Sequence, residues 1–120
     1  MTSPLLHKAL CEGLKDSGVK VINIGMGPTP MTYFAHYHFD ADAAVMLTGS
    51  HNPSEYNGFK MVFNKHSFFA DDIQSLQKLI DENKLESFEG KIINQDITKD
   101  YIDRNLLNIH LNRELKIAWD

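Results

Sequence analysis

The sequence has a single cysteine, no long apolar run and no signal-like start. Because Cys11 is the only cysteine in 120 residues, no internal disulfide can form. Its spacing from Ala9, Leu10 and Leu14 is helical, which favours a small core residue over a nucleophile. No apolar stretch approaches the ~20 residues that a membrane-spanning helix needs, and the N-terminus lacks the charged-then-apolar pattern of a signal peptide. We therefore expect a cytoplasmic protein that binds no membrane.

An excess of basic residues is also missing. Sixteen acidic residues against twelve lysines and arginines give a net charge of −4. Nucleic-acid-binding domains usually carry a basic stripe, so nucleic acid is not expected as a partner. With 42% apolar residues, a chain of this length can build the core of one domain.

Helical and strand patterns alternate along the chain. Ser3 and Pro4 are typical of a helix start, and Gly18 is typical of a helix end. Such alternation predicts an α/β protein. The expected helices cover residues 3–17, 30–39, 73–80 and 97–106, and the expected strands cover residues 19–24, 43–47, 59–63 and 115–120.

A polar cluster directly follows the apolar strand at residues 43–47. Residues 48–53 read TGSHNP, and open α/β sheets place their ligand sites at the carboxyl ends of strands. Ser50 is a candidate nucleophile or phosphate carrier. On an extended backbone His51 would point away from Ser50, so adjacency alone does not predict a Ser-His pair. Each residue alone is more typical of an ordinary loop, but the whole cluster behind a buried strand favours a functional site.

The dipeptide Asn57-Gly58 predicts a tight turn in which Gly58 takes a positive φ. Such a turn would fold the chain back and bring Lys60 towards Ser50. An ammonium group beside a hydroxyl suits phosphoryl transfer, which depends on positioning and charge compensation.

Other patterns are weaker. The glycines at residues 25 and 27 begin like a dinucleotide fingerprint, but Pro30 stands where the third glycine belongs. His36 and His38 are two residues apart, so on a helix they point in different directions, and we expect surface histidines rather than a metal site. Ser50 also lacks the flanking glycines of a hydrolase nucleophile elbow.

The string TGSHNP, followed by NGFK at residues 57–60, resembles the phosphoserine loop of the α-D-phosphohexomutases, the phosphoglucomutase and phosphomannomutase family. The resemblance extends to residues 2–4, 19–25 and 28–31. It implies a three-layer α/β/α fold with a mixed sheet. Residues 1–112 would form domain I without its first strand, and residues 113–120 would form the first strand of domain II.

The resemblance also implies a phosphotransferase reaction that isomerises its substrate. Ser50 would pass a phosphoryl group to a hexose phosphate, giving a bisphosphate, and hexose 1-phosphate and hexose 6-phosphate would interconvert. Lys60 would stabilise charge or act as acid and base, while His51 and Asn52 would contact substrate or shape the loop. Glucose 1,6-bisphosphate is the expected activator, and Mg²⁺ would bind an oxygen of phosphorylated Ser50 together with three aspartates of a D-x-D-x-D loop.

The sequence departs from this family in two respects. It contains no D-x-D-x-D, and its only arginines are Arg104 and Arg113, whereas the family has an arginine on a strand expected just before Thr2. We therefore expect an incomplete Mg²⁺ site and no turnover by this chain alone. An unpaired slot in the sheet would favour oligomers or strand swapping. The alternative function is a non-catalytic α/β module, or a truncated gene product, that acts by oligomerisation or partner binding.

Overall fold

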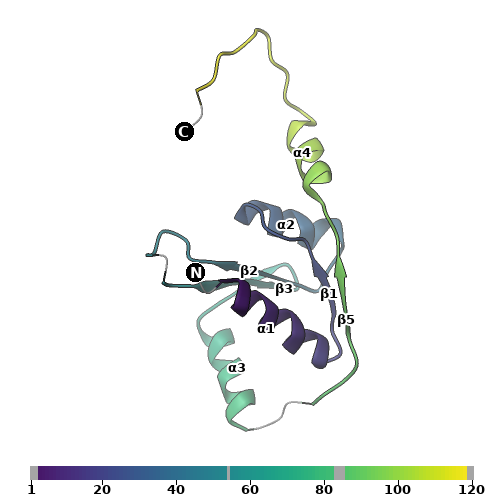
Figure 1. Ribbon diagram of the computed structural model, residues 1–120, viewed down its shortest axis with the longest axis vertical. Coiled ribbons are helices and arrows are strands. Elements are labelled where there is room, and N and C mark those ends of the chain that lie inside the picture. The colour runs from purple at the N-terminus through teal and green to yellow at the C-terminus, as the bar shows by residue number, and fades with distance from the viewer. Residues whose placement is uncertain (1–2, 54, 83–85, 119–120) are drawn as a thin grey trace.

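The computed structural model describes residues 3–53, 55–82 and 86–118 and has the helix and strand alternation of an α/β protein (Figure 1). The α/β class is confirmed, and all four expected helices are present. The elements, in chain order, are α1 (Ser3–Asp16), β1 (Lys20–Asn23), α2 (Thr29–His38), β2 (Ala43–Thr48), β3 (Gly58–Phe63), β4 (His66–Phe68), α3 (Asp71–Asp81), β5 (Lys91–Asn94) and α4 (Thr98–Leu106).

The strands form two sheets that differ in direction. β1 pairs with β5 in parallel, and β2, β3 and β4 form an antiparallel meander. The expectation of mixed strand directions is confirmed. β5 was not predicted from the sequence, because its four residues offer only the β-branched pair Ile92 and Ile93 as a signal.

A tight hairpin joins β3 to β4, and it too was not predicted. Asn64 and Lys65 have φ values of 48° and 66°, while Phe63 pairs with His66. Two consecutive left-handed residues are typical of the type I′ turn. Glycine usually takes the second position, so a lysine there concealed the turn from sequence analysis.

Gly18 ends α1 as its sequence position predicts. Its φ is 84°, its N–H donates to the carbonyl of Lys15, and the N–H of Val19 donates to the carbonyl of Leu14. These bonds satisfy carbonyls that the helix end leaves free. A Cβ on Gly18 would lie 2.7 Å from Cβ of Phe88, so the position also requires a close approach.

The core is small and lies around α2. Met31, Ala35 and Ile97 are its buried centre, and partly buried side chains from neighbouring segments pack against them. The neighbours are Ile24, Phe34, Phe39 and Tyr101.

His36 corrects the expectation of surface histidines on this helix. It is only 2% exposed, and neither ring nitrogen has a hydrogen-bond partner among the described residues. The reason is its position: the buried residues of α2 share one helix face, and His36 lies one turn after Thr32 on that face.

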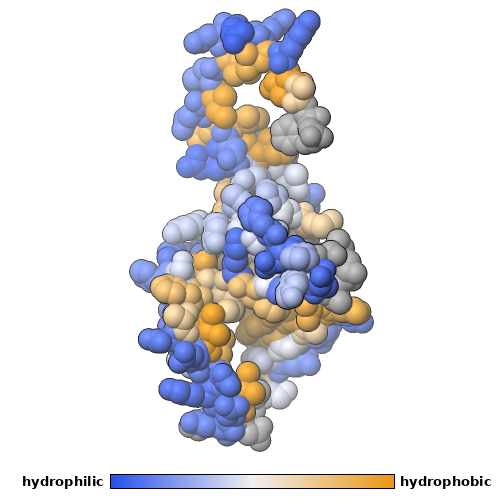
Figure 2. Space-filling view, turned by 90° about the vertical axis from the view of Figure 1, so that its left-hand side faces the viewer, coloured by the Kyte–Doolittle hydropathy of each residue, from blue (hydrophilic) through white to orange (hydrophobic). Residues whose placement is uncertain are grey.

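Many apolar side chains remain exposed, and Figure 2 shows them at the surface across the middle of the molecule. In α3, Ile73, Leu76 and Ile80 are 46%, 41% and 60% exposed. The molecule is elongated, 61 × 32 × 26 Å, because α4 and the residues after it extend away from the sheets (Figure 1). Among the described residues, no helix has both the length and the apolar character to cross a bilayer.

The strand expected at residues 115–120 is not present in its described part. Residues 115–118 have no strand conformation or ladder partner, and residues 119–120 lie outside the described residues. A strand needs a neighbour for its backbone groups, and this segment runs clear of both sheets (Figure 1). The division between residues 1–112 and 113–120 remains a prediction.

Candidate functional site

The polar cluster lies on the loop of residues 49–57, which connects β2 to β3 at one end of the antiparallel sheet (Figure 1). The register pairs Thr48 with Gly58 and Met46 with Lys60. Directly opposed residues put their side chains on the same face of a sheet. Lys60 therefore shares a face with Met46 and Thr48, which lie four and two residues before Ser50.

Ser50 has a left-handed backbone, with a φ of 52°. Its N–H donates to Oγ1 of Thr48 at 2.9 Å, and the N–H of Asn52 donates to the carbonyl of Gly49 at 3.0 Å. A non-glycine residue in this region costs of order 1–3 kcal/mol, and such strain is common at functional sites. The side chain of Thr48, two residues before Ser50, closes a side-chain turn. Sequence analysis missed this turn, although the spacing of two residues is typical of it.

Ser50 and His51 are in contact through their side chains. Oγ of Ser50 lies 3.3 Å from Nδ1 of His51, and both residues are exposed. The expectation that His51 points away from Ser50 is wrong, because it assumed an extended backbone and Ser50 is left-handed. An imidazole at this distance from a hydroxyl can accept or return its proton.

The expected tight turn at Asn57-Gly58 is wrong. Gly58 belongs to β3 and is not among the positive-φ glycines, so the chain reverses over the whole loop instead. Two turns make this reversal, one closed by Asn52 and one by Tyr56, whose N–H donates to the carbonyl of Pro53. Asn57 has another role, since its Oδ1 accepts a hydrogen bond of 2.6 Å from Oγ of Ser3 at the start of α1. No sequence signal pointed to this contact across 54 positions.

Of the four predicted site residues, the structure brings Ser50 and His51 into contact and places Asn52 and Lys60 near them. Ser50 and His51 touch, Asn52 closes the turn beside them, and the exposed Lys60 shares the sheet face of Thr48. The cluster is therefore an exposed hydroxyl and imidazole at a strand end, with an ammonium group on the adjacent strand.

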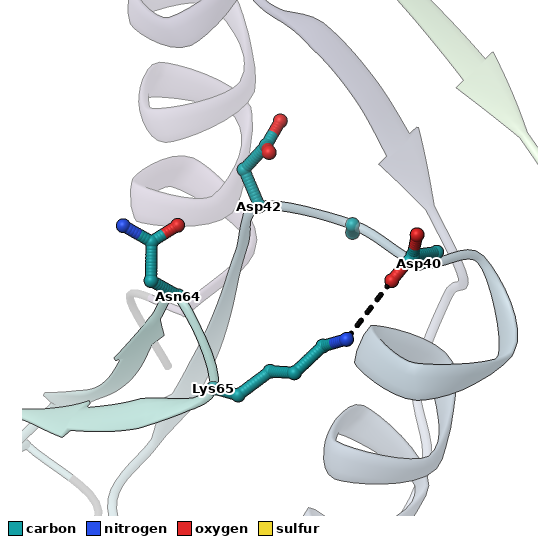
Figure 3. A pocket seen from close by; sticks show the side chains of 5 residues that line it. Asp40, Asp42, Asn64 and Lys65 are labelled. Atoms are coloured by element: carbon teal, nitrogen blue, oxygen red, sulfur yellow. Dashed lines mark hydrogen bonds and ion pairs between the residues drawn. The ribbon is translucent and has the colours of Figure 1, made fainter.

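The described residues do not form a metal site by themselves. No group of three His, Cys, Asp or Glu side chains in this part of the chain could hold an ion. Asp40 and Asp42 precede β2, at the end opposite Ser50, where they line a pocket with Asn64 and Lys65 (Figure 3). The ammonium group of Lys65 lies 3.1 Å from Oδ1 of Asp40, so a cation of the protein already neutralises this carboxylate.

Cys11 does not have the environment of a nucleophile. Burial, and secondarily the charge of Glu12, raises the pKa of its thiol. Its Sγ lies 3.6 Å from Nε2 of His7, on the same helix. A raised thiol pKa leaves little thiolate, which is the reactive form.

Comparisons with known proteins agree on one group of relatives. Residues 1–87 match the family described as phosphoglucomutase/phosphomannomutase, alpha/beta/alpha domain I. The whole chain is 38% identical over 120 residues to phosphomannomutase/phosphoglucomutase of Pseudomonas aeruginosa and 36% identical over 122 residues to phosphoglucomutase of Neisseria meningitidis serogroup B. It covers 26% of each of these two relatives. It is also 34% identical over 124 residues to a probable phosphoglucosamine mutase of Pyrococcus furiosus, of which it covers 27%.

One solved structure extends this agreement to the fold. A phosphoglucomutase/phosphomannomutase family protein of Burkholderia thailandensis superposes with a TM-score of 0.84 and 38% sequence identity. The match covers 92% of this chain and 26% of that protein. The chain therefore spans about a quarter of the length of the relatives that it matches.

Proposed function

Because this chain belongs to the phosphoglucomutase/phosphomannomutase family, we propose that Ser50 is the phosphoryl carrier of a hexose phosphate mutase. The observation that supports this most is the geometry of Ser50. Its hydroxyl is exposed on a strained backbone at a strand end, 3.3 Å from an imidazole and beside the strand that carries Lys60.

The proposed reaction has two phosphoryl transfers. In the first, the bond between phosphorus and Oγ of phosphorylated Ser50 breaks, a bond to a free hydroxyl of the hexose monophosphate forms, and the proton of that hydroxyl passes to Oγ of Ser50. In the second, Oγ of Ser50 bonds to the other phosphoryl group of the resulting bisphosphate as the bond between that phosphorus and the sugar oxygen breaks. His51 accepts the Ser50 proton and returns it to the freed sugar oxygen. The Lys60 ammonium group balances the charge on the transferring group, which is the main requirement of such a reaction. His51 and Asn52 contact the substrate phosphate.

Mg²⁺ would be bound partly by phosphorylated Ser50 and partly by groups outside the described residues. The described residues supply no cluster of three ligands, so this part of the chain does not fit an ion on its own. A phosphate oxygen on Ser50 would be a suitable hard ligand for Mg²⁺, and the remaining ligands would have to come from elsewhere.

Turnover is proposed for a larger assembly than this chain. The chain spans about a quarter of its relatives' length, and the reaction needs groups that orient the sugar during both transfers. We expect mutase activity of this chain alone to be at background. We also propose glucose 1,6-bisphosphate as the activating donor, and the cytoplasm as the location.

The transfer to Ser50 can be tested with this chain. It is incubated with glucose 1,6-bisphosphate, and intact mass spectrometry measures whether one phosphoryl group is gained. We expect the gain in the wild type and in Ser67→Ala, which removes an exposed hydroxyl from β4, but not in Ser50→Ala. A wild type that gains no phosphoryl group, or a gain that persists in Ser50→Ala, contradicts the proposal.

A second candidate function is association without catalysis. The exposed apolar face of α3 favours it, since contiguous apolar surface usually marks an interaction site. Here the partner would be another chain, or a second copy joined through unpaired strand edges. The two candidates differ in whether Ser50 becomes phosphorylated.

A further inference from the structure

Hydrogen bonds fix both ends of the Ser50 loop, and one of them comes from a distant helix. We propose that Ser3 and Asn57 are positioning residues for phosphoryl transfer at Ser50, an inference that rests on the proposed function. Ser3 would act through Asn57, and neither side chain needs to touch the reacting atoms.

The contact itself is short and partly protected from solvent. Oγ of Ser3 donates to Oδ1 of Asn57 at 2.6 Å, across 54 positions, and both residues are partly buried. A partly buried hydrogen bond competes less with water than an exposed one, so breaking it leaves an acceptor poorly satisfied. This bond is therefore able to hold the first turn of α1 against the loop.

The two ends of the loop are held by different side chains. At the outgoing end, Oγ1 of Thr48 accepts the N–H of Ser50. At the returning end, Asn57 is held by Ser3, and the next residue, Gly58, pairs with Thr48 across the sheet. The loop between them is largely exposed, and two short-range turn bonds, made by the N–H groups of Asn52 and Tyr56, close it.

The position of Lys60 depends on this returning end. Lys60 lies three residues after Asn57 on β3, so a shift of Asn57 moves the start of the strand that carries the ammonium group. Phosphoryl transfer depends on the placement of charge relative to the transferring group. The contact between Ser3 and Asn57 thus acts with the ladder between β2 and β3 in placing Lys60 relative to Ser50.

The test measures the initial rate of Ser50 phosphorylation by glucose 1,6-bisphosphate in the full chain. We expect Ser3→Ala and Asn57→Ala each to lower the rate roughly tenfold, because misplaced groups lose rate steeply. Since Ser3 acts through Asn57, the double variant should be no slower than Asn57→Ala alone. Ser3→Thr keeps the hydroxyl and should restore the rate.

Ser17→Ala is the matched control. Oγ of Ser17 donates to the carbonyl of Gly13 at 2.9 Å at the other end of α1, so the variant removes a hydroxyl bond from the same helix but not from the loop. Its rate should equal that of the wild type, even if its melting temperature falls as far as that of Ser3→Ala. Equal rates for Ser3→Ala and Ser17→Ala would overturn the inference.

Amide hydrogen exchange gives a readout that does not need the reaction. Ser3→Ala should speed exchange at Ser50 and Gly58, while Ser17→Ala should leave both unchanged. If exchange does not respond, the contact does not hold the loop and the inference is overturned. If the wild type is not phosphorylated at all, the proposed function fails, and the role of Ser3 in phosphoryl transfer fails with it. If the wild type is phosphorylated and Ser3→Ala is phosphorylated at the same rate, only the inference about Ser3 and Asn57 is overturned.

Discussion

Lys60 is the residue whose role the register defines most directly. Its pairing with Met46 puts it on the face of Thr48, next to the loop that carries Ser50. Lys60→Met keeps the length of the side chain and removes its charge, so we expect Ser50 phosphorylation to slow by about 10²-fold, as for the loss of one charge-stabilising group. The measurement is the initial rate of mass gain with glucose 1,6-bisphosphate.

Lys65→Met is the control for this prediction. It removes the same charge at the far end of the β2–β3 pair, where Lys65 contacts Asp40. Its rate should match the wild type. An unchanged rate in Lys60→Met would remove Lys60 from the mechanism.

His36 bears on stability rather than on the reaction. Both of its ring nitrogens are buried without a hydrogen-bond partner among the described residues, which costs about 1–3 kcal/mol. His36→Leu removes the polar atoms and keeps a similar volume, so the free energy of unfolding should rise by about 1 kcal/mol in urea denaturation. His38→Leu, at an exposed position on the same helix, should change it by less than about 0.5 kcal/mol. A destabilised His36→Leu would indicate that the imidazole has a partner.

At the scale of elements, Gly13 inside α1 and Gly18 just after its end lead to opposite predictions. Gly18 has a φ of 84° and a close contact with Phe88, so Gly18→Ala should lower the free energy of unfolding by more than about 1 kcal/mol. Gly13 is inside the helix, and an added Cβ there meets nothing within 4 Å. Gly13→Ala should therefore raise the free energy of unfolding by about 0.5–1 kcal/mol.

Thermal unfolding followed by circular dichroism at 222 nm measures both variants of α1. The opposite signs are the test, because a general intolerance of this helix to substitution would lower both stabilities. Equal changes of the unfolding free energy in the two variants would mean that the left-handed backbone of Gly18 does not contribute to stability.

The elements also show which features sequence analysis can reach. α1 to α4, β2 and β3 have periodic apolar residues and clear boundaries, so their patterns predicted them. The type I′ turn at Asn64 and Lys65 has no glycine, and β5 offers only the β-branched pair Ile92 and Ile93, so local pattern missed both. The candidate site divides in the same way. The identities of Ser50, His51 and Lys60 were readable, but the left-handed backbone of Ser50 and the contact of Ser3 with Asn57 depend on tertiary structure.

At the scale of the molecule, this chain is less compact than a typical domain of its length. Its radius of gyration is 17.3 Å, against about 14 Å expected for a compact domain of 120 residues. The apolar stripe of α3, formed by Ile73, Leu76 and Ile80, is between 41% and 60% exposed. Burial of such a stripe is favourable at about 25 cal/mol per Å² of apolar surface, which provides a driving force for association.

We therefore expect the chain alone to self-associate, with the α3 stripe at the contact. Sedimentation velocity over a concentration series should show an apparent mass that rises with concentration, and added sulfate should strengthen the effect because it favours apolar burial. Leu76→Glu places a charge in the stripe and should keep the chain monomeric over the same range. Gln74→Glu makes the same change in charge off the stripe on the same helix and should associate like the wild type. The two variants gain the same charge, so only the lost apolar contact of Leu76 can make them behave differently. A wild type that stays monomeric, or equal behaviour of the two variants, would therefore show that the α3 stripe drives no association.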